Sequence, residues 1–126
     1  MIRSDAAVLI VDDEPGMCWA LGHILQGSDI VSVTATTGQE ALRLAERQRF
    51  RLAFVDAKLP DAEGLELARR IREADPGIRI VLISGYFYGD DSEVLQASAA
   101  GVINGFVSKP FLHDEVRTIA RAALAP

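Results

Sequence analysis

The chain has 126 residues, a length typical of one domain with a single hydrophobic core. Its net charge of −5 argues against a chain that grips the phosphates of nucleic acid by itself. The single cysteine, Cys18, excludes an internal disulfide and indicates a reducing compartment. No apolar stretch is long enough for a signal peptide or a membrane span, so we expect one cytoplasmic domain over residues 1–126.

Apolar patterns predict strands and helices in alternation along the first half of the chain. The run 7–11 is typical of a buried strand, and Pro15 suits the first turn of the helix that follows. Residues 30–35 predict a second strand, nearer an edge of the sheet. Thr37 and Glu40 then form a capping box, which predicts the start of a second helix.

The second half of the chain continues this alternation. The continuous apolar run 52–55 predicts a strand buried on both faces, and it ends in Asp56. The elements expected after it are a helix over 64–74, a strand over 78–83, a short helix from Asp90 or Asp91 to Gly101, a strand over 105–108 and a last helix with Val116 and Leu124 on its apolar face. The short helix is rich in Ala and Ser, so we expect it to be the least stable.

Five strand–helix units in alternation predict an α/β fold. We expect a flavodoxin-like (βα)5 three-layer sandwich with a central parallel five-stranded sheet of order 2-1-3-4-5. In such a sheet the functional site lies beyond the carboxyl ends of the strands, near the first and third strands. The residues that end the strands are therefore the candidates for function.

Polar residues end four of the five expected strands, namely Asp12 with Asp13, Asp56, Ser84 and Lys109. Carboxylates in one crevice repel each other unless a cation lies between them, and hard oxygen ligands select Mg²⁺, with Mn²⁺ as the alternative. A lysine and a hydroxyl beside this cation suit the oxygens of a phosphate. The set therefore predicts phosphoryl transfer, with an aspartate as covalent acceptor.

Each of these residues also has a purely structural explanation when it is taken alone. Asp12 and Asp13 precede a helix headed by proline and are suited to cap it, and Asp56 is suited to cap the next helix. Taken alone, Lys109 is explained as a solvated charge on the surface. Cys18 is explained as a packing residue of a helix. Their joint placement at four strand ends favours a functional site.

Several motifs resemble the receiver domain of bacterial two-component response regulators. They are Val-Asp-Asp-Glu-Pro at 11–15, Asp56 with Leu59-Pro60 and Gly64 behind it, Ser84-Gly85, and Lys109-Pro110-Phe111. The likeness covers nearly the whole chain. It implies a phosphorylation-dependent signalling switch, not an enzyme that acts on other substrates, in which Asp56 takes a phosphoryl group from the phosphohistidine of a histidine kinase.

The same resemblance implies a Mg²⁺ site at the acceptor. Asp13 would bind the metal directly, and Asp12 would assist. Asp56 and the backbone carbonyl of Lys58 would be further ligands.

The resemblance also implies how the site responds. Ser84, which stands where the family more often has threonine, would swing toward the phosphoryl group, and Phe106 would turn inward behind it. Lys109 would pair with a phosphoryl oxygen and would be joined to Pro110 by a cis peptide. We expect the aromatic loop 85–89 to move as well.

Partners follow from the resemblance in the same way. We expect a sensor histidine kinase, and an output domain, for example for transcription regulation, if the chain is part of a longer one. A homodimer would use the face made by the fourth helix, the fifth strand and the fifth helix. Direct contact with nucleic acid or with a membrane is not expected.

Two other functions fit part of the pattern. A phosphatase of the haloacid dehalogenase type also uses an Asp nucleophile, but it needs a second Asp two residues later, where this chain has Lys58. A pseudo-receiver would be an interaction module without phosphorylation. Labelling by a small phosphodonor with Mg²⁺ distinguishes it from a receiver.

Overall fold

One parallel sheet forms the centre of the computed structural model, which describes residues 7–26, 30–85, 92–109, 111 and 113–124. The strands are β1 (Ala7–Val11), β2 (Val31–Ala35), β3 (Leu52–Asp56), β4 (Arg79–Ser84) and β5 (Gly105–Ser108). They lie in the order β2-β1-β3-β4-β5, and every neighbouring pair is parallel. The predicted strand order is therefore confirmed.

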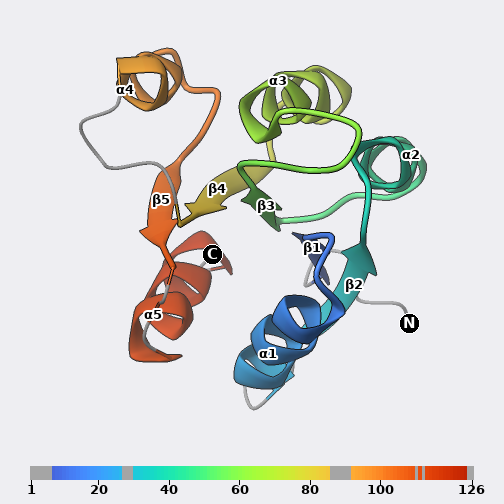
Figure 1. Ribbon diagram of the computed structural model, residues 1–126, viewed down its shortest axis with the longest axis vertical. Helices are drawn as coiled ribbons and strands as arrows, with labels where there is room; N and C mark the ends of the chain where they lie inside the picture. Colours follow the sequence, from blue (N-terminus) through green and yellow to red (C-terminus); the bar gives the residue numbers. More distant parts are fainter. Residues whose placement is uncertain (1–6, 27–29, 86–91, 110, 112, 125–126) are drawn as a thin grey trace.

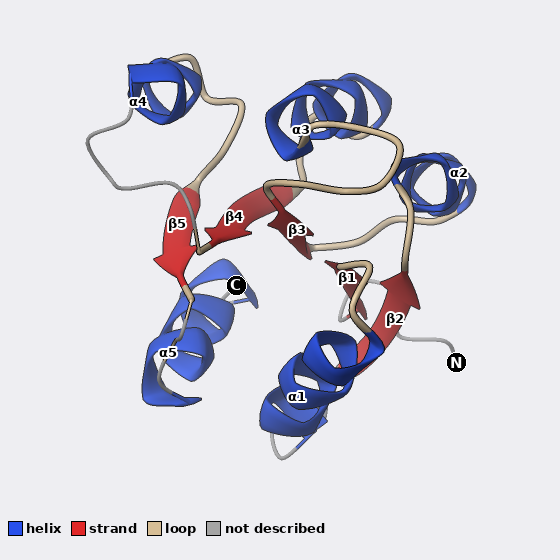
Figure 2. Ribbon diagram, in the orientation of Figure 1, coloured by secondary structure: helices blue, strands red, loops and turns tan. Residues whose placement is uncertain are grey.

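Helices cover both faces of this sheet. They are α1 (Pro15–Gln26), α2 (Gly38–Arg47), α3 (Gly64–Ala74), α4 (Ser92–Ala99) and α5 (His113–Leu124). Figure 1 shows α2, α3 and α4 on one face and α1 and α5 on the other, and Figure 2 shows the three layers. The predicted three-layer flavodoxin-like sandwich is confirmed. Among the described residues, no helix combines the length and the apolar character that crossing a bilayer requires.

The sheet separates two hydrophobic clusters because side chains alternate along each strand. Leu9 and Val55 belong to the cluster under α2, α3 and α4, whereas Ile10 and Phe54 belong to the cluster under α1 and α5. All five residues of β3 are buried, as its continuous apolar run predicts. This central strand therefore holds Asp56 at a fixed place at its carboxyl end.

Helix α4 packs more thinly than the other helices. Only Val94 and Ala97 are buried in it, and Leu95 is 52% exposed. The chain leaves the helix through Gly101, whose φ of 78° lies in the left-handed region that favours glycine. The expected thin apolar face is confirmed, whereas the expected caps, Asp90 and Asp91, lie outside the described residues.

The predicted capping box starts helix α2. Thr37 Oγ1 accepts a hydrogen bond from the N–H of Glu40 at 3.1 Å. Glu40 Oε1 accepts one from the N–H of Thr36 at 2.9 Å, so the return bond reaches one residue earlier than in the standard box.

A second cap of helix α2 comes from the loop between β3 and α3. The carboxylate of Asp61 accepts hydrogen bonds from the N–H groups of Gly38 at 2.8 Å and of Gln39 at 3.0 Å. These bonds lower the pKa of Asp61 because they favour its charged form. The loop that follows Asp56 is thereby tied to α2.

Arg72 of helix α3 joins three segments near the amino end of the sheet. Its guanidinium donates hydrogen bonds to the carbonyl oxygens of Pro76 at 3.0 Å, of Ile78, and of Val102 at 3.1 Å. It also donates to Asn104 Oδ1 at 2.8 Å. Burial lowers the pKa of Arg72. This one side chain links α3 both to the start of β4 and to the loop before β5.

Candidate functional site

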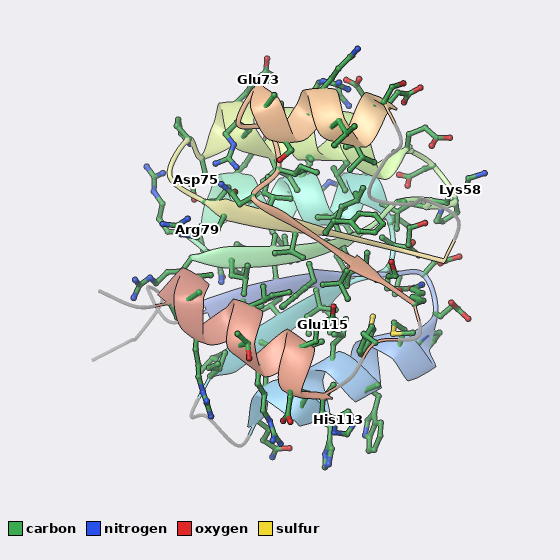
Figure 3. The ribbon with its side chains drawn as sticks, turned by 90° about the vertical axis from the view of Figure 1, so that its left-hand side faces the viewer. Lys58, Glu73, Asp75, Arg79, His113 and Glu115 are labelled. Atoms are coloured by element: carbon green, nitrogen blue, oxygen red, sulfur yellow. The ribbon has the colours of Figure 1, made fainter. Side chains whose placement is uncertain are left out.

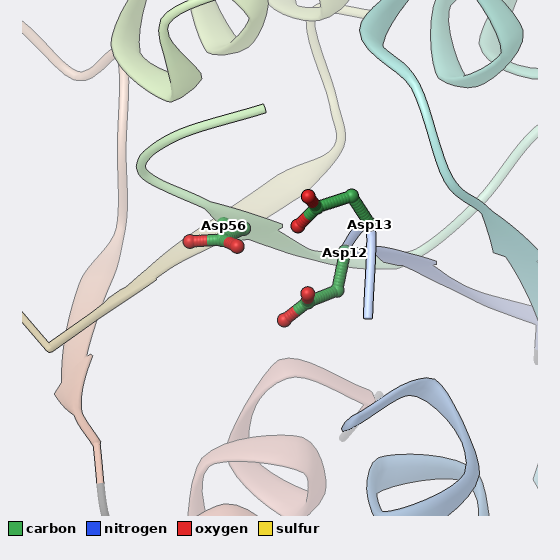
Figure 4. A group of neighbouring side chains, drawn as sticks. All are labelled: Asp12, Asp13 and Asp56. Carbon is green, nitrogen blue, oxygen red and sulfur yellow. The ribbon is translucent and has the colours of Figure 1, made fainter. Parts of the chain in front are cut away.

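Three carboxylates meet at the carboxyl end of the sheet. Asp12 and Asp13 follow β1 and Asp56 ends β3, and these two strands are direct neighbours. One oxygen of each carboxylate lies within 4.8 Å of the others, and Figure 4 shows the three side chains gathered at the two strand ends. Asp12 and Asp56 are only 1% and 8% exposed, whereas Asp13 is exposed to solvent.

A close approach of helix α3 fixes the backbone at Asp56. The N–H of Ala57 donates to the carbonyl oxygen of Ile83 at 2.8 Å, and the N–H of Gly64 donates to that of Ala57 at 2.7 Å. A Cβ at position 64 would lie 2.7 Å from the Cα of Ala57 and closer still to the carbonyl oxygen of Asp56, so only glycine fits. The residue that caps α3 is Glu63, without a side-chain hydrogen bond, so Asp56 is not its cap.

Asp12 is held by contacts on every side. Its Oδ1 accepts a hydrogen bond from the N–H of Glu14 at 3.0 Å, and its N–H donates to the carbonyl oxygen of Ala35 at 3.1 Å. The Sγ of Cys18 donates to the carbonyl oxygen of Asp12 at 3.2 Å. Burial raises the pKa of this thiol, and the charge of Asp12 adds to the effect. Cys18 is buried in α1, as expected, and it also supports Asp12.

Lys109 brings a positive charge into this cluster. Its Nζ lies 3.2 Å from Asp12 Oδ2, 3.6 Å from Asp56 Oδ2 and 3.7 Å from Glu14 Oε1. Burial lowers the pKa of Lys109, but the charges of Asp12 and Asp56 outweigh it and raise the pKa above its ordinary value. The ammonium group therefore stays charged at neutral pH. Its backbone N–H donates to the carbonyl oxygen of Ser84 at 3.0 Å, which joins the ends of β4 and β5.

The carboxyl group of Asp56 has an unfavourable environment for its charge. Burial raises the pKa of Asp56 and the charge of Asp12 raises it further, against the opposing effects of Lys109 and of the Lys58 N–H at 3.4 Å. A divalent cation between the carboxylates would relieve this repulsion. The cluster offers only oxygen ligands and is suited to Mg²⁺ in preference to a soft metal.

The other predicted site residues lie on β4, on β5 and directly after β3. Ser84 is buried at the end of β4 and is paired in register with Ser108 of β5. Phe106 in β5 is half-buried and packs against the cluster under α2, α3 and α4. The roles of Ser84 and Phe106 as switch residues, and of the Lys58 carbonyl as a metal ligand, stay predictions. Pro110 and most of the aromatic loop, 86–89, lie outside the described residues.

Glu14 and Cys18 join the cluster although we did not predict them there. Glu14 simply continues the acidic run of Asp12 and Asp13, so its place was visible in the sequence. Cys18 follows one helical turn later, and its N–H donates to the carbonyl oxygen of Glu14 at 3.2 Å. Helical spacing was the signal that points its side chain back to the strand end.

Comparisons with known proteins agree with this geometry. The family model described as response regulator receiver domain matches residues 8–121. The chain is 30% identical over 114 residues to the transcriptional regulatory protein GlrR of Escherichia coli (strain K12), which covers 90% of this chain and 25% of that protein. It is 28% identical over 117 residues to the sporulation initiation phosphotransferase F of Bacillus subtilis (strain 168), covering 93% and 92% of the two chains.

Solved structures show the same similarity. A CheY-like response regulator receiver domain protein from Methanospirillum hungatei JF-1 matches with a TM-score of 0.86 and 28% identity, over 94% of this chain and 92% of that one. The chain spans about a quarter of the length of GlrR but nearly the full length of the sporulation protein.

Proposed function

The chain belongs to the response regulator receiver domain family, and from this premise we propose that residues 1–126 form one receiver domain with Asp56 as its phosphoryl acceptor. A sensor histidine kinase supplies the phosphoryl group in the presence of Mg²⁺. The observation that carries this proposal is the contact of Lys109 with both Asp56 and Asp12 inside one acidic cluster.

The transfer follows from the place of Asp56 at the end of β3. One oxygen of Asp56 forms the new bond to phosphorus while the bond from phosphorus to the kinase histidine nitrogen breaks. The other ring nitrogen of that histidine carries a proton, so the imidazole leaves as a neutral group. Lys109 Nζ, 3.6 Å from Asp56 Oδ2, neutralises charge on the transferred group. We assign the metal to Asp12, Asp13, Asp56 and the backbone carbonyl of Lys58. When bound, Mg²⁺ withdraws charge from the phosphoryl oxygens.

The response follows from the links of Lys109 to its neighbours. Its backbone bond to Ser84 joins the active end of β4 to that of β5, so a change at Lys109 acts on both strands. We propose that Ser84 and Phe106 then shift and alter the face made by α4, β5 and α5. That face contacts a second copy of the chain or an output domain. Regulation of transcription, which the name of GlrR states for that relative, belongs to such an output domain.

Phosphorylation by a small phosphodonor tests this function. Acetyl phosphate with Mg²⁺ is expected to add one phosphoryl group to the wild-type chain, measured by intact mass. Asp56→Asn should lose this labelling, because the amide lacks the nucleophilic oxygen. Asp61→Asn, at an exposed carboxylate of the same loop, serves as the matched control and should label normally.

Three results would contradict the proposal. Equal labelling of wild type and Asp56→Asn would place the acceptor elsewhere. Full labelling in EDTA would remove the metal from the mechanism. An unlabelled but folded wild-type chain would identify a pseudo-receiver.

A further inference from the structure

The outer edge of strand β2 is open to a further strand. β2 lies at one end of the sheet order and, among the described strands, pairs only with β1 (Figure 1). We propose that this edge pairs antiparallel with the same edge of a second copy of the chain, so that the two copies share one continuous sheet. This association uses a surface separate from the face of α4, β5 and α5 in the proposed function.

The pairing with β1 determines which backbone groups of β2 point outward. The carbonyl oxygen of Ala35 accepts a hydrogen bond from the N–H of Asp12 at 3.1 Å, so the backbone groups of Ala35 point toward β1 and its continuation. Because successive residues of a strand point these groups to opposite sides, those of Thr34 and Ser32 point away from the sheet. No described residue beyond the edge forms a hydrogen bond with them.

Glu40 closes this edge at its carboxyl end. The N–H of Thr36 is the next outward group after Thr34, and it donates to Glu40 Oε1 at 2.9 Å. The open part of the edge is therefore short and consists of the N–H and carbonyl groups of Ser32 and Thr34. Such groups are a template for another strand unless charge, proline or a bulge protects them. The sequence of β2 is Val-Ser-Val-Thr-Ala, with neither a charge nor a proline.

The open groups of β2 are complementary to themselves. In the antiparallel register that pairs all five residues, Val33 lies on the two-fold axis. Ser32 of each copy then faces Thr34 of the other, and each of these two pairs exchanges two N–H···O bonds, so that every outward group gains a partner. Val31 comes to lie opposite Ala35 of the second copy, an apolar pair without charge repulsion. The arrangement uses the same patch on both copies and closes at two.

Exposed apolar side chains flank the open edge on both faces of the sheet. Val31, which alternates with Val33 on the face of α2, is 56% exposed, and Trp19 of α1 on the other face is 70% exposed. Trp19 stacks on His23 with ring centroids 5.0 Å apart, and both line a hollow of about 370 Å³ together with Ser32. Edge pairing places Thr34 of the second copy beside Ser32, so it covers the edge and this hollow together.

The size of the interface predicts a weak association. One pair of five-residue strands with these flanking side chains falls at the low end of interface size, below the roughly 1,200–2,000 Å² of stable complexes. We therefore expect a dissociation constant on the order of 100 µM.

Sedimentation equilibrium of the whole chain tests the pairing. It is carried out from about 10 µM to about 1 mM in EDTA and without a phosphodonor, around the expected dissociation constant. Wild type and Asp56→Asn should dimerise over the same concentration range, because β2 is separated from the acceptor strand β3 by β1. The fluorescence of Trp19, the only tryptophan, should change over that range as well.

Two variants at position 34 test the register. Thr34 is exposed, so a charged side chain is tolerated there in the monomer. Across the two-fold axis the two residues at position 34 are diagonal neighbours about 7–8 Å apart, within reach of long side chains. Like charges repel, so Thr34→Lys and Thr34→Glu should each weaken the dimer by at least about fivefold. An equimolar mixture of the two variants should dimerise at least as tightly as wild type, a rescue that misfolded chains cannot give.

Thr118→Lys is the matched control. Thr118 is exposed on α5, the helix that carries His113 and Glu115 and that Figure 3 shows on the side of the molecule away from β2. The same change of charge at this position should leave the dissociation constant within about twofold of wild type. Loss of the dimer in Thr118→Lys but not in Thr34→Lys would assign the contact to the face of α4, β5 and α5 and overturn the edge pairing.

Three other results would overturn the proposal. They are a wild-type chain that stays monomeric at about 1 mM, a monomeric Asp56→Asn beside a dimeric wild type, and a mixture of the two Thr34 variants that does not recover dimerisation. Acetyl phosphate should label Asp56 equally in wild type and in Thr34→Lys. A failure of edge pairing would thus leave the proposed phosphorylation standing, and a failure of labelling would leave the edge pairing standing.

Discussion

Charged side chains have opposite effects on stability at the two ends of the central sheet. At the carboxyl end, the carboxylates of Asp12, Asp13 and Asp56 lie close together, and Lys109 contacts those of Asp12 and Asp56. Burial together with the charge of Asp12 raises the pKa of Asp56. Toward the amino end, the terminal nitrogens of Arg72 donate hydrogen bonds to three carbonyl oxygens and to one side-chain amide oxygen. Only its buried Nε has no partner among the described residues. The carboxylates at the carboxyl end repel one another until a cation lies between them, whereas the hydrogen bonds of Arg72 stabilise the fold.

Removal of Arg72 should give the largest change in stability. Arg72→Ala leaves the carbonyls of Ile78 and Val102 without this donor and separates α3 from the loop before β5. We expect the free energy of unfolding to fall by about 2–4 kcal/mol. Urea unfolding measures it, with Arg70→Ala, an exposed residue of the same helix, as a control within about 0.5 kcal/mol of wild type. If Arg72→Ala lost no more unfolding free energy than Arg70→Ala, Arg72 would not be a stabilising residue.

Removal of the charge of Asp56 at the carboxyl end should instead raise the free energy of unfolding. The raised pKa of Asp56 means that folding disfavours its charged form, so the cost is present at neutral pH and disappears as the pH falls below the folded pKa. Asp56→Asn should therefore stabilise the metal-free chain at pH 7 by on the order of 1 kcal/mol. Saturating Mg²⁺ should stabilise wild type more than the variant, which reduces or reverses the difference. The comparison is urea unfolding in EDTA and in Mg²⁺, and a less stable variant in EDTA would contradict it.

The charge of Asp61 stabilises the fold, although Asp61 lies in the loop that follows Asp56. It is therefore a useful comparison with Asp56, whose charge opposes folding. Its lowered pKa means that the cap on α2 stabilises the fold above the unfolded pKa of about 3.9 and that this stabilisation is lost as the pH falls through the folded value. Asp61→Asn should lower the melting temperature slightly at pH 7 and hardly at all in strong acid. Thermal unfolding across pH measures this, with Glu66→Gln on the neighbouring surface of α3 as a control. A difference that persists unchanged in acid would mean that the charge does not matter.

Periodicity was enough to predict the sheet order and the end of the sheet that carries the site. Asp12, Asp56 and Lys109 were found because each directly ends a predicted strand, and parallel strands bring their ends together. Arg72 could not be found in this way, because its position on α3 resembles any half-buried helix position and its partner Val102 lies 30 residues further along the chain. Such contacts depend on how two loops pack, which local sequence patterns do not encode.

The thin packing of α4 has a consequence for hydrogen exchange and for signalling. Local opening of a helix becomes easier as fewer apolar side chains are buried, and α4 buries two residues where α3 buries five. Amide protons of α4 should therefore exchange through small, local opening events. Exchange of those of α3 should need larger openings of the structure. A segment that opens so easily should have several arrangements within a few kcal/mol of one another. Under the proposed function, the charge of the phosphoryl group on Asp56 would then be enough to favour one of these arrangements of α4.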